Sequence, residues 1–284
     1  MSTRRALRSA TLKTLMGCAL MLAPGARCAH AGNDIINSNN QVGIQFVDTH
    51  FAYKEKDDFG APLDSESGWV PGIGVSASLM KNWFVENFYL QAQFSWSDGK
   101  TAYKGAYIDG GGYGSVVAKD GATVKDFDFR VGKGFELRRD AMLTPFFGIG
   151  WHDWDRKVNA GEDYSNGYYG AGLLFQYSPL SRMVLSVDGL VGRTFDSQIS
   201  IASIPDAGIV GSSLSLGQAT TYKLGVSDDY ALTRSIHVNA GFEWTKFDYG
   251  KSSPDPTDTY YEPDSRTSNV TVRVGAGYSF GDGQ

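Results

Sequence analysis

Residues 268–280, near the end of the chain, read SNVTVRVGAGYSF. Every second side chain is apolar, from Val270 and Val272 to the aromatic pair Tyr278 and Phe280. The positions between them are polar or small, and one of them is Arg273. Because side chains alternate between the two faces of a β-strand, this period of two predicts a strand. An apolar face that ends in aromatic residues, opposite a glycine-rich polar face, is typical of a strand that faces lipid.

The first 31 residues differ in character from the rest of the chain. A short apolar segment is followed by Ala29-His30-Ala31, a small-x-small cleavage site. The segment has about half of the roughly 20 apolar residues that a membrane-spanning helix needs. Four basic residues precede it: Arg4, Arg5, Arg8 and Lys13. We therefore predict a signal peptide over residues 1–31 and a β-barrel domain over residues 32–284.

The composition of the predicted mature chain excludes several classes of protein. Without its first 31 residues the chain keeps 21 basic and 31 acidic side chains, a net charge near −10. It has no basic stripe that could meet phosphates, which argues against nucleic-acid binding. Cys18 and Cys28 both leave with the signal, so the fold cannot depend on disulfides. The chain has no apolar run of about eighteen residues, which excludes helical membrane spans.

Alternation of apolar and polar residues predicts ten strands. Most of them are longer than the roughly 5–6 residues usual in globular proteins, and they suit a tilted strand that crosses a bilayer in about 9–11 residues. In the first strand the apolar set changes parity between Val47 and Thr49, which predicts a β-bulge. The predicted strands are residues 41–53, 69–79, 84–96, 123–135, 143–154, 164–177, 183–195, 220–227, 236–247 and 268–280.

Short and long connections alternate between these strands. The longer, polar ones are residues 57–68, 98–121, 155–163, 197–217 and 250–266. Outer-membrane barrels have short periplasmic turns and long external loops in this order. A soluble barrel would instead present charged residues on its outer face. We predict an all-β, antiparallel, up-and-down transmembrane β-barrel of about ten strands, with eight as the alternative. It would lie in the cell outer membrane after secretion to the periplasm and signal cleavage.

These features resemble the small outer-membrane β-barrel proteins of Gram-negative bacteria, the OmpA-type group. The resemblance includes the stretch TPFFGIGWHDWDR at residues 144–156 and the terminal GYSF, and it covers the whole mature chain. It implies outer-membrane lipid and lipopolysaccharide as partners. It also implies that the barrel-assembly machinery reads the last strand, from Ser268 to Phe280. Such chains normally end on an aromatic residue, whereas here residues 281–284 follow Phe280.

A barrel of ten strands is also similar to the omptin proteases, which carry an Asp pair and an Asp-His pair above the membrane. The Asp pair is expected near the outer end of the third strand, where this chain reads Phe94-Ser95-Trp96-Ser97. The outer ends of the later strands carry no Asp-x-His pair. We therefore predict that the protein is not an enzyme and uses no cofactor or metal. An omptin-like surface hydrolase is the distant alternative.

Charged residues on the polar faces of the strands form the candidate site. Asp126 and Asp128 flank Phe127, so both carboxylates would point into the lumen. Paired carboxylates can serve acid–base chemistry or bind a cation. The simpler interpretation is a network of ion pairs that fills a narrow lumen. Its predicted members are Asp126, Asp128, Arg130, Asp188, Lys223, Glu243 and Arg273.

Aromatic residues predict two further features. Six at strand ends would form girdles at the membrane interfaces: Trp69, Trp83, Trp96, Trp154, Trp244 and Tyr278. Five tyrosines among small and acidic loop residues could bind an extracellular ligand: Tyr103, Tyr107, Tyr113, Tyr260 and Tyr261. The sequence thus favours a structural or surface-interaction role, adhesin-like, with a largely filled polar lumen. A narrow porin-like channel for small solutes or ions is the alternative.

Overall fold

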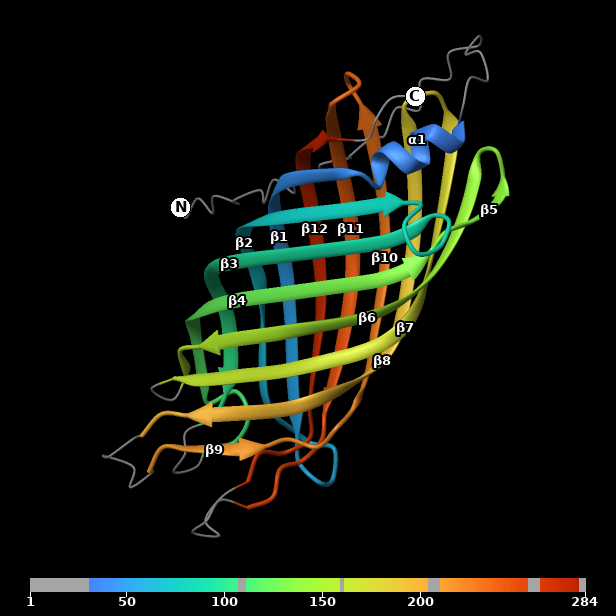
Figure 1. Cartoon of the computed structure of the whole chain (residues 1–284). Helices are drawn as coiled ribbons and strands as arrows, with labels where there is room; N and C mark the ends of the chain where they lie inside the picture. The colour runs from blue at the N-terminus through green and yellow to red at the C-terminus, as the bar shows by residue number, and fades with distance from the viewer. Residues whose placement is uncertain (1–30, 107–110, 159–160, 204–209, 255–260, 281–284) are drawn as a thin grey trace, which may run out of the picture.

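A computed structural model of the protein describes residues 31–106, 111–158, 161–203, 210–254 and 261–280. The predicted signal peptide falls almost entirely on residues 1–30, which lie outside the described residues. Ten long antiparallel strands form a closed barrel, accompanied by one helix and two short strands (Figure 1). The elements are α1 (Ala31–Ser38), β1 (Gln41–Lys56), β2 (Pro62–Lys81), β3 (Phe88–Gly105), β4 (Val116–Lys133), β5 (Phe135–Arg138), β6 (Ala141–Arg156), β7 (Glu162–Leu180), β8 (Met183–Ile201), β9 (Ser212–Ser215), β10 (Thr220–Ala231), β11 (Ile236–Tyr249) and β12 (Ser265–Ser279).

The long strands pair in the order in which they follow one another along the chain. The first and last strands close the ring: β12 pairs with β1 from Ser279 opposite Gln41 to Ser265 opposite Glu55. The two short strands lie off the ring, with β5 paired to β6 and β9 paired to β8. Closure leaves no open sheet edge, as a barrel in lipid requires. The predicted ten-stranded up-and-down barrel is confirmed.

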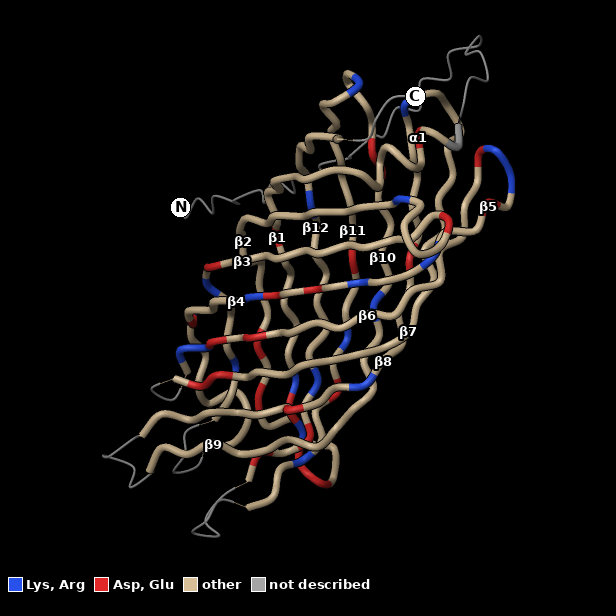
Figure 2. Tube along the Cα trace, viewed as in Figure 1, with Lys and Arg blue, Asp and Glu red and all other residues tan. Residues whose placement is uncertain are grey.

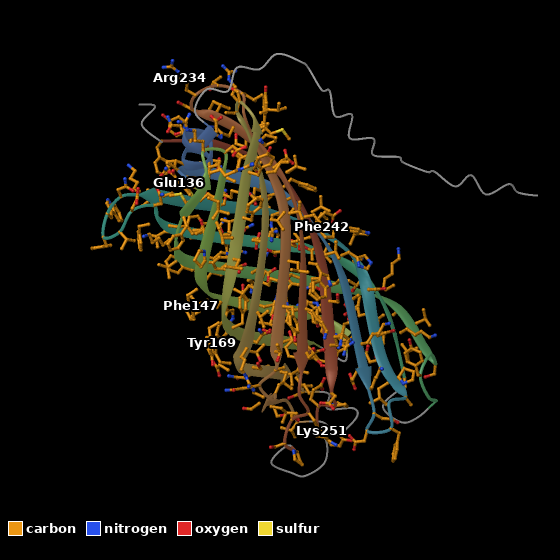
Figure 3. The ribbon with its side chains drawn as sticks, turned by 90° about the vertical axis from the view of Figure 1, so that its right-hand side faces the viewer. Glu136, Phe147, Tyr169, Arg234, Phe242 and Lys251 are labelled. Atoms are coloured by element: carbon orange, nitrogen blue, oxygen red, sulfur yellow. The ribbon has the colours of Figure 1, made fainter. Side chains whose placement is uncertain are left out.

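A belt of exposed apolar side chains surrounds the outside of the barrel. Phe147, Tyr169 and Phe242 project outward at mid-height (Figure 3) and are 50%, 44% and 48% exposed. Further members are Ile44, Ile73, Val75, Phe94, Phe127, Ile149, Leu173, Val187, Val191, Leu224, Val226 and Val274. Charged positions gather near the two ends of the barrel and also run along β4 (Figure 2). A continuous apolar surface of this extent is the lipid-facing band of a membrane barrel.

The predicted bulge in the first strand is wrong. β1 pairs with both β12 and β2 through residues 47–49 without a shift of register. The apolar set changes parity because the outward belt of β1 ends at Phe46, while the next apolar residues face the lumen. Val47, Phe51 and Tyr53 are at most 1% exposed. The parity change therefore marks the place where the strand leaves the membrane.

The strands extend beyond the belt further than predicted. β1 runs to Lys56 and β2 begins at Pro62, so residues 57–61 alone connect two strands that were expected to be joined by a longer loop. The third strand starts at Phe88 rather than at residue 84, because residues 82–87 form the turn before it. Short turns lie at the end of the barrel that carries α1, and the longer loops lie at the opposite end (Figure 1). By the usual arrangement of such barrels, these are the periplasmic and external ends.

In the described part of the chain, no helix is long and apolar enough to span a membrane.

Candidate functional site in the barrel lumen

The N-terminal segment covers the periplasmic mouth of the barrel. Ile35 of α1 is 1% exposed and belongs to the buried apolar cluster. The amide of Asn39 donates a hydrogen bond of 2.6 Å to Oε1 of Gln176 on β7. The side chain of Asn40 donates to the carbonyl oxygen of Met80 on β2 and accepts from its backbone N–H, each at 3.0 Å. These bonds tie the segment to strands on two sides of the mouth.

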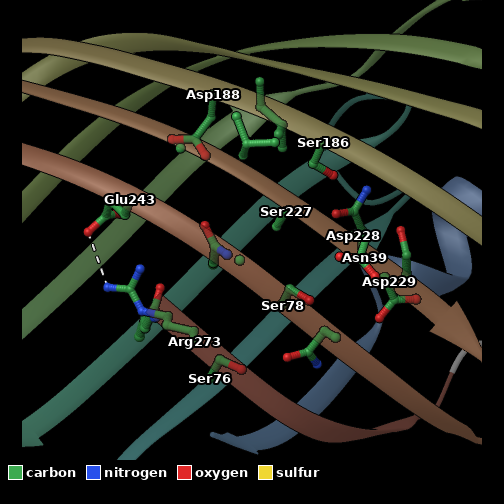
Figure 4. A pocket seen from close by; sticks show the side chains of 18 of the residues that line it. Asn39, Ser76, Ser78, Ser186, Asp188, Ser227, Asp228, Asp229, Glu243 and Arg273 are labelled. Carbon is green, nitrogen blue, oxygen red and sulfur yellow. Dashed lines mark hydrogen bonds and ion pairs between the residues drawn. The ribbon is translucent and has the colours of Figure 1, made fainter. Parts of the chain in front are cut away.

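A polar chamber lies in the lumen next to this segment. Its volume is about 160 Å³, and Figure 4 shows its wall, with Ser76, Ser78, Ser186 and Ser227 among the lining side chains. Seven amide side chains also line it: Asn39, Gln41, Gln45, Gln91, Gln93, Gln176 and Asn239. A polar cavity of this size has room for several ordered water molecules. The chamber is therefore suited to water and small polar solutes rather than to apolar ligands.

Oppositely charged side chains meet beside the chamber. Nζ of Lys223 lies 2.7 Å from Oδ2 of Asp128 and 3.5 Å from Oε1 of Glu243. Nη2 of Arg273 lies 3.1 Å from the same Glu243 oxygen, an ion pair drawn in Figure 4. The side chains of these four residues are between 5% and 13% exposed, so water screens them little.

A second pair extends this cluster. Nη1 of Arg130 lies 3.0 Å from Oδ2 of Asp188, and its Nη2 lies 3.9 Å from Glu243. The cluster thus joins six of the seven charges proposed from the sequence, three cations and three carboxylates. A buried charge is tolerated when it is paired and hydrogen-bonded, as each of these is. We call these six residues, Asp128, Arg130, Asp188, Lys223, Glu243 and Arg273, the lumen charge network.

Asp126, the seventh predicted member, pairs with a histidine instead. It is the cross-strand partner of His152, and its Oδ1 lies 2.7 Å from Nδ1 of that ring. His152 is fully buried, and its ring stacks on Phe51 and Phe247 with centroids 6.1 and 4.8 Å away. Sequence reasoning missed this pair because its signal is the register of β4 against β6, which alternation alone does not reveal.

A layer of buried aromatic rings fills the lumen towards the external end. Tyr53, Trp154 and Tyr164 are at most 1% exposed, with ring centroids between 5.2 and 5.7 Å apart. Phe51, Phe247 and Tyr249 complete this aromatic layer. The predicted place of Trp154 in the membrane girdle is wrong. It lies three residues after the outward-facing Trp151, an odd separation, so its side chain points into the lumen.

A single arginine holds several carboxylates beyond this layer. Arg156 is fully buried, with Nη2 at 3.0 Å from Asp64, Nε at 3.0 Å from Glu66 and Nη1 at 3.2 Å from Glu162. Its guanidinium also lies over the ring of Tyr53, 4.8 Å from the centroid. Asp64, Glu66 and Glu162 lie at the starts of β2 and β7, and Arg156 ends β6, so all four lie beyond the apolar belt and form the external mouth of the barrel.

Two more carboxyl groups at the external mouth hold protons near neutral pH. Glu262, from the loop between β11 and β12, accepts hydrogen bonds from the hydroxyls of Tyr164 at 2.5 Å and Tyr53 at 3.3 Å. Burial raises the pKa of Glu262 to about 7. Burial and then the charges of Glu262 and Asp64 raise the pKa of Glu55, at the external end of β1, to about 8. When both groups are protonated, they add no negative charge to the external mouth, so its carboxylates repel one another less and can pack around the single Arg156.

The predicted extracellular contact set lies in three different environments. Tyr113 and Tyr261 are 38% and 39% exposed at the external end. Tyr103 is only 7% exposed, because β3 continues past the membrane and turns this ring inward, 5.7 Å from the Arg156 guanidinium. Tyr107 and Tyr260 lie outside the described residues.

Two features bear on catalysis. At the outer part of the third strand, where the Asp pair of an omptin protease was expected, the inward positions are Ser95 and Ser97. Their side chains are 6% and 2% exposed. Within the described ranges, no group of three or more His, Cys, Asp or Glu side chains could hold a metal ion.

Comparison with known proteins gives a likeness of fold. No protein-family model matches the chain, and no curated protein matches it. Among solved structures it is similar to the outer membrane protease OmpT from Escherichia coli, with a TM-score of 0.53 and 10% identity over 86% of this chain and 97% of that chain. It is also similar to the outer membrane protein OprG from Pseudomonas aeruginosa (TM-score 0.35, 13% identity, 85% and 98% covered) and to Neisserial surface protein A (0.34, 10%, 84% and 97%). At these identities the likeness shows the fold alone. The closed barrel and its apolar belt identify an integral outer-membrane β-barrel protein.

Proposed function

We propose that the protein is a non-conducting outer-membrane barrel with a structural or surface-interaction role, adhesin-like, that acts through its external end. The observation that carries this proposal is the aromatic layer. Its rings stack on one another across the lumen, between the polar chamber and the external mouth. Trp154 and Tyr164 are each 0% exposed. A narrow barrel whose interior is packed with side chains leaves no water-filled path for solutes.

The construction of the external end supports a binding role. Nζ of Lys251 lies 3.0 Å from Asp58 in the loop between β1 and β2, and 3.9 Å from the ring centroid of Tyr261. These contacts join two external loops. Phe59 in the first of these loops is 97% exposed. Loops that are already held in place lose less conformational entropy on binding a partner. Tyr113, Tyr261 and Phe59 are the residues that we assign to this surface.

The remaining partners follow from the barrel itself. The belt would contact outer-membrane lipid and lipopolysaccharide, because it is apolar around the whole ring. The barrel-assembly machinery would read β12, which pairs with both β1 and β11 and so completes closure. The proposal includes no catalytic role and no nucleic-acid partner.

Planar-bilayer conductance of the refolded mature protein tests the closed lumen. A heat-dependent gel shift first establishes that the barrel is folded. We expect silent bilayers for the natural chain. Discrete channels whose cation preference falls in an Asp126→Asn/Asp128→Asn variant would contradict the proposal. They would favour the second candidate, a narrow channel. The polar chamber would then form the periplasmic half of its pore.

Attachment of cells that display the protein to a protein-coated surface tests the external end. We expect Lys251→Ala/Tyr261→Ala to reduce attachment, because it separates the joined loops and removes an exposed ring. Lys157→Ala is the matched control, since Lys157 is also an external lysine in an exposed ion pair, with Asp155. If cells with and without the protein attach equally, the surface-interaction role is wrong and a structural role remains.

A further inference from the structure

A second pocket lies on the periplasmic face, outside the lumen. It has a volume of about 330 Å³ and is formed between α1 and the turn that joins β2 to β3. The apolar part of its wall comes from Ile36, Met80 and Trp83, and the polar part from asparagines and one lysine. This volume is within the range of about 300–1,000 Å³ that is usual for small-molecule sites.

The charge of the pocket is positive and unpaired. Lys81 lines it, and no carboxylate in the described part of the chain does. Within the described residues, the ammonium of Lys81 makes no ion pair and no hydrogen bond. Glu86, the one carboxylate of the turn, does not line the pocket. A free cation among uncharged walls selects an anionic ligand.

Amide groups supply further hydrogen-bond donors. Asn37 of α1 and Asn87 of the turn both line the pocket, and neither side chain has a hydrogen bond to another described residue. Asn87 has a φ of +51°, a left-handed conformation that asparagine adopts more readily than most residues other than glycine. It is held there by bonds from its N–H to Oδ1 of Asn82 at 2.8 Å and from the N–H of Gly134 to its carbonyl at 2.9 Å. These two bonds fix the backbone that carries the Asn87 amide.

An aromatic ridge borders the pocket on the membrane side. We define the ridge as Trp83, Phe84 and Phe88. Trp83 is 61% exposed and Phe84 is 86% exposed, and both rings lie against Phe88, with centroids 6.4 and 5.8 Å away. Phe88 begins the outward face of β3 that continues into the apolar belt. The ridge thus extends the lipid-facing surface to the edge of the cationic pocket.

We propose that this pocket binds the phosphate headgroup of a phospholipid from the periplasmic leaflet. Lys81 provides the charge, and the amides of Asn37 and Asn87 donate hydrogen bonds to phosphate oxygens. The aromatic ridge holds the glycerol and the upper acyl chains. The ligand is bound at the membrane surface rather than in the lumen, so this inference is independent of whether the barrel conducts.

Isothermal titration calorimetry of the full mature protein in a non-ionic detergent tests the site. The probe is dihexanoyl phosphatidylglycerol, and we expect one saturable site per barrel. Lys81→Gln should weaken binding about tenfold or more, because a charge-assisted hydrogen bond is lost. Lys133→Gln is the matched control: Lys133 lies at the same end, opposite Phe88 on β4, but outside the pocket, and its loss should leave the affinity unchanged.

Two further arms separate the lipid from other anions. Inorganic phosphate should bind much more weakly than the lipid. Trp83→Ala/Phe84→Ala should weaken binding of the lipid but not of phosphate. The absence of saturable lipid binding would overturn the proposal. Equal losses in Lys81→Gln and Lys133→Gln, or phosphate binding as tight as lipid binding, would overturn it as well. Asn37→Leu, which leaves the turn intact, repeats the test if Lys81→Gln fails to fold.

Discussion

Asp126 and His152 face each other on β4 and β6, and a bond of 2.7 Å joins Oδ1 of the carboxyl group to Nδ1 of the ring. The ring lies at the junction of the two halves of the lumen, where polar side chains give way to the aromatic layer. Stacking on Phe51 and Phe247 and this bond together position the ring, because Nε2 has no hydrogen-bond partner among the described residues.

We expect Asp126→Asn to destabilise the barrel by about 1.5–3 kcal/mol, the usual contribution of a hydrogen bond to a charged group. Urea unfolding in detergent micelles would measure this loss. Asp153→Asn is the control, because Asp153 pairs with the half-exposed Lys125 on the outer surface. An exposed pair of this kind contributes about 0–1 kcal/mol. If the two substitutions lower the free energy of unfolding equally, the bond between Asp126 and His152 stabilises the barrel no more than an exposed ion pair does.

Glu243 connects the three cations of the lumen charge network. We expect Glu243→Gln to reduce the free energy of unfolding by about 3–5 kcal/mol, because it leaves buried positive charge without compensation. The same urea unfolding measurement applies. Glu136→Gln, at an exposed position of β5 labelled in Figure 3, should change stability by less than about 0.5 kcal/mol. A loss below about 1 kcal/mol for Glu243→Gln would mean that water enters the network freely.

The external mouth should loosen as the pH rises. The pKa of Glu55 is raised to about 8 and that of Glu262 to about 7, above the ordinary carboxyl value of 4.5, so the folded mouth binds more protons than the open one. The stabilisation is complete below about pH 4.5 and is lost as the pH rises through 7 and 8. Protection of the amides at the external ends of β1 and β7, that is, their exchange rate relative to an unfolded amide at the same pH, should therefore be weaker at pH 9 than at pH 6.

Glu55→Gln/Glu262→Gln should abolish this pH dependence, since neither amide titrates. Protection at Gly148 and Gly170, inside the membrane belt, serves as the internal control and should not follow the same profile. If amide protection at the external mouth still depended on pH in the double variant, other titrating groups would be responsible for the effect.

Gly150 makes room for Tyr168, whose hydroxyl donates to Asp128 and lies within 3.1 Å of Nζ of Lys223. A Cβ atom on Gly150 would overlap the Tyr168 ring and the carbonyl oxygen of Phe127. We expect Gly150→Ala to destabilise the barrel by about 1–3 kcal/mol through overpacking. Gly189→Ala is the control, because its nearest neighbour is the end of the Leu224 side chain, at 3.2 Å. Similar stabilities of the two variants would contradict this packing.

Alternation of apolar and polar residues predicted the strands inside the membrane belt but not their ends beyond it. Within the belt one face of each strand must be apolar, so the period of two is clear, and all ten strands were placed correctly there. Beyond the belt both faces can be polar or apolar, and the pattern no longer distinguishes strand from loop. The strand ends around Lys56, Pro62 and Gly105 were therefore missed. The same loss of pattern led to the false bulge at Val47.

By itself the sequence determined the fold class and the face on which each lumen charge lies, because strand parity is a local property; closure of the ring decided between ten strands and eight. Only the tertiary structure decided which of those charges meet. Arg156 pairs with Asp64 and Glu66, about ninety residues earlier, and Lys223 with Asp128, on the far side of the ring. These contacts depend on the register of neighbouring strands and on ring closure, which bring distant side chains together inside a narrow lumen. No pattern within a single strand contains that information.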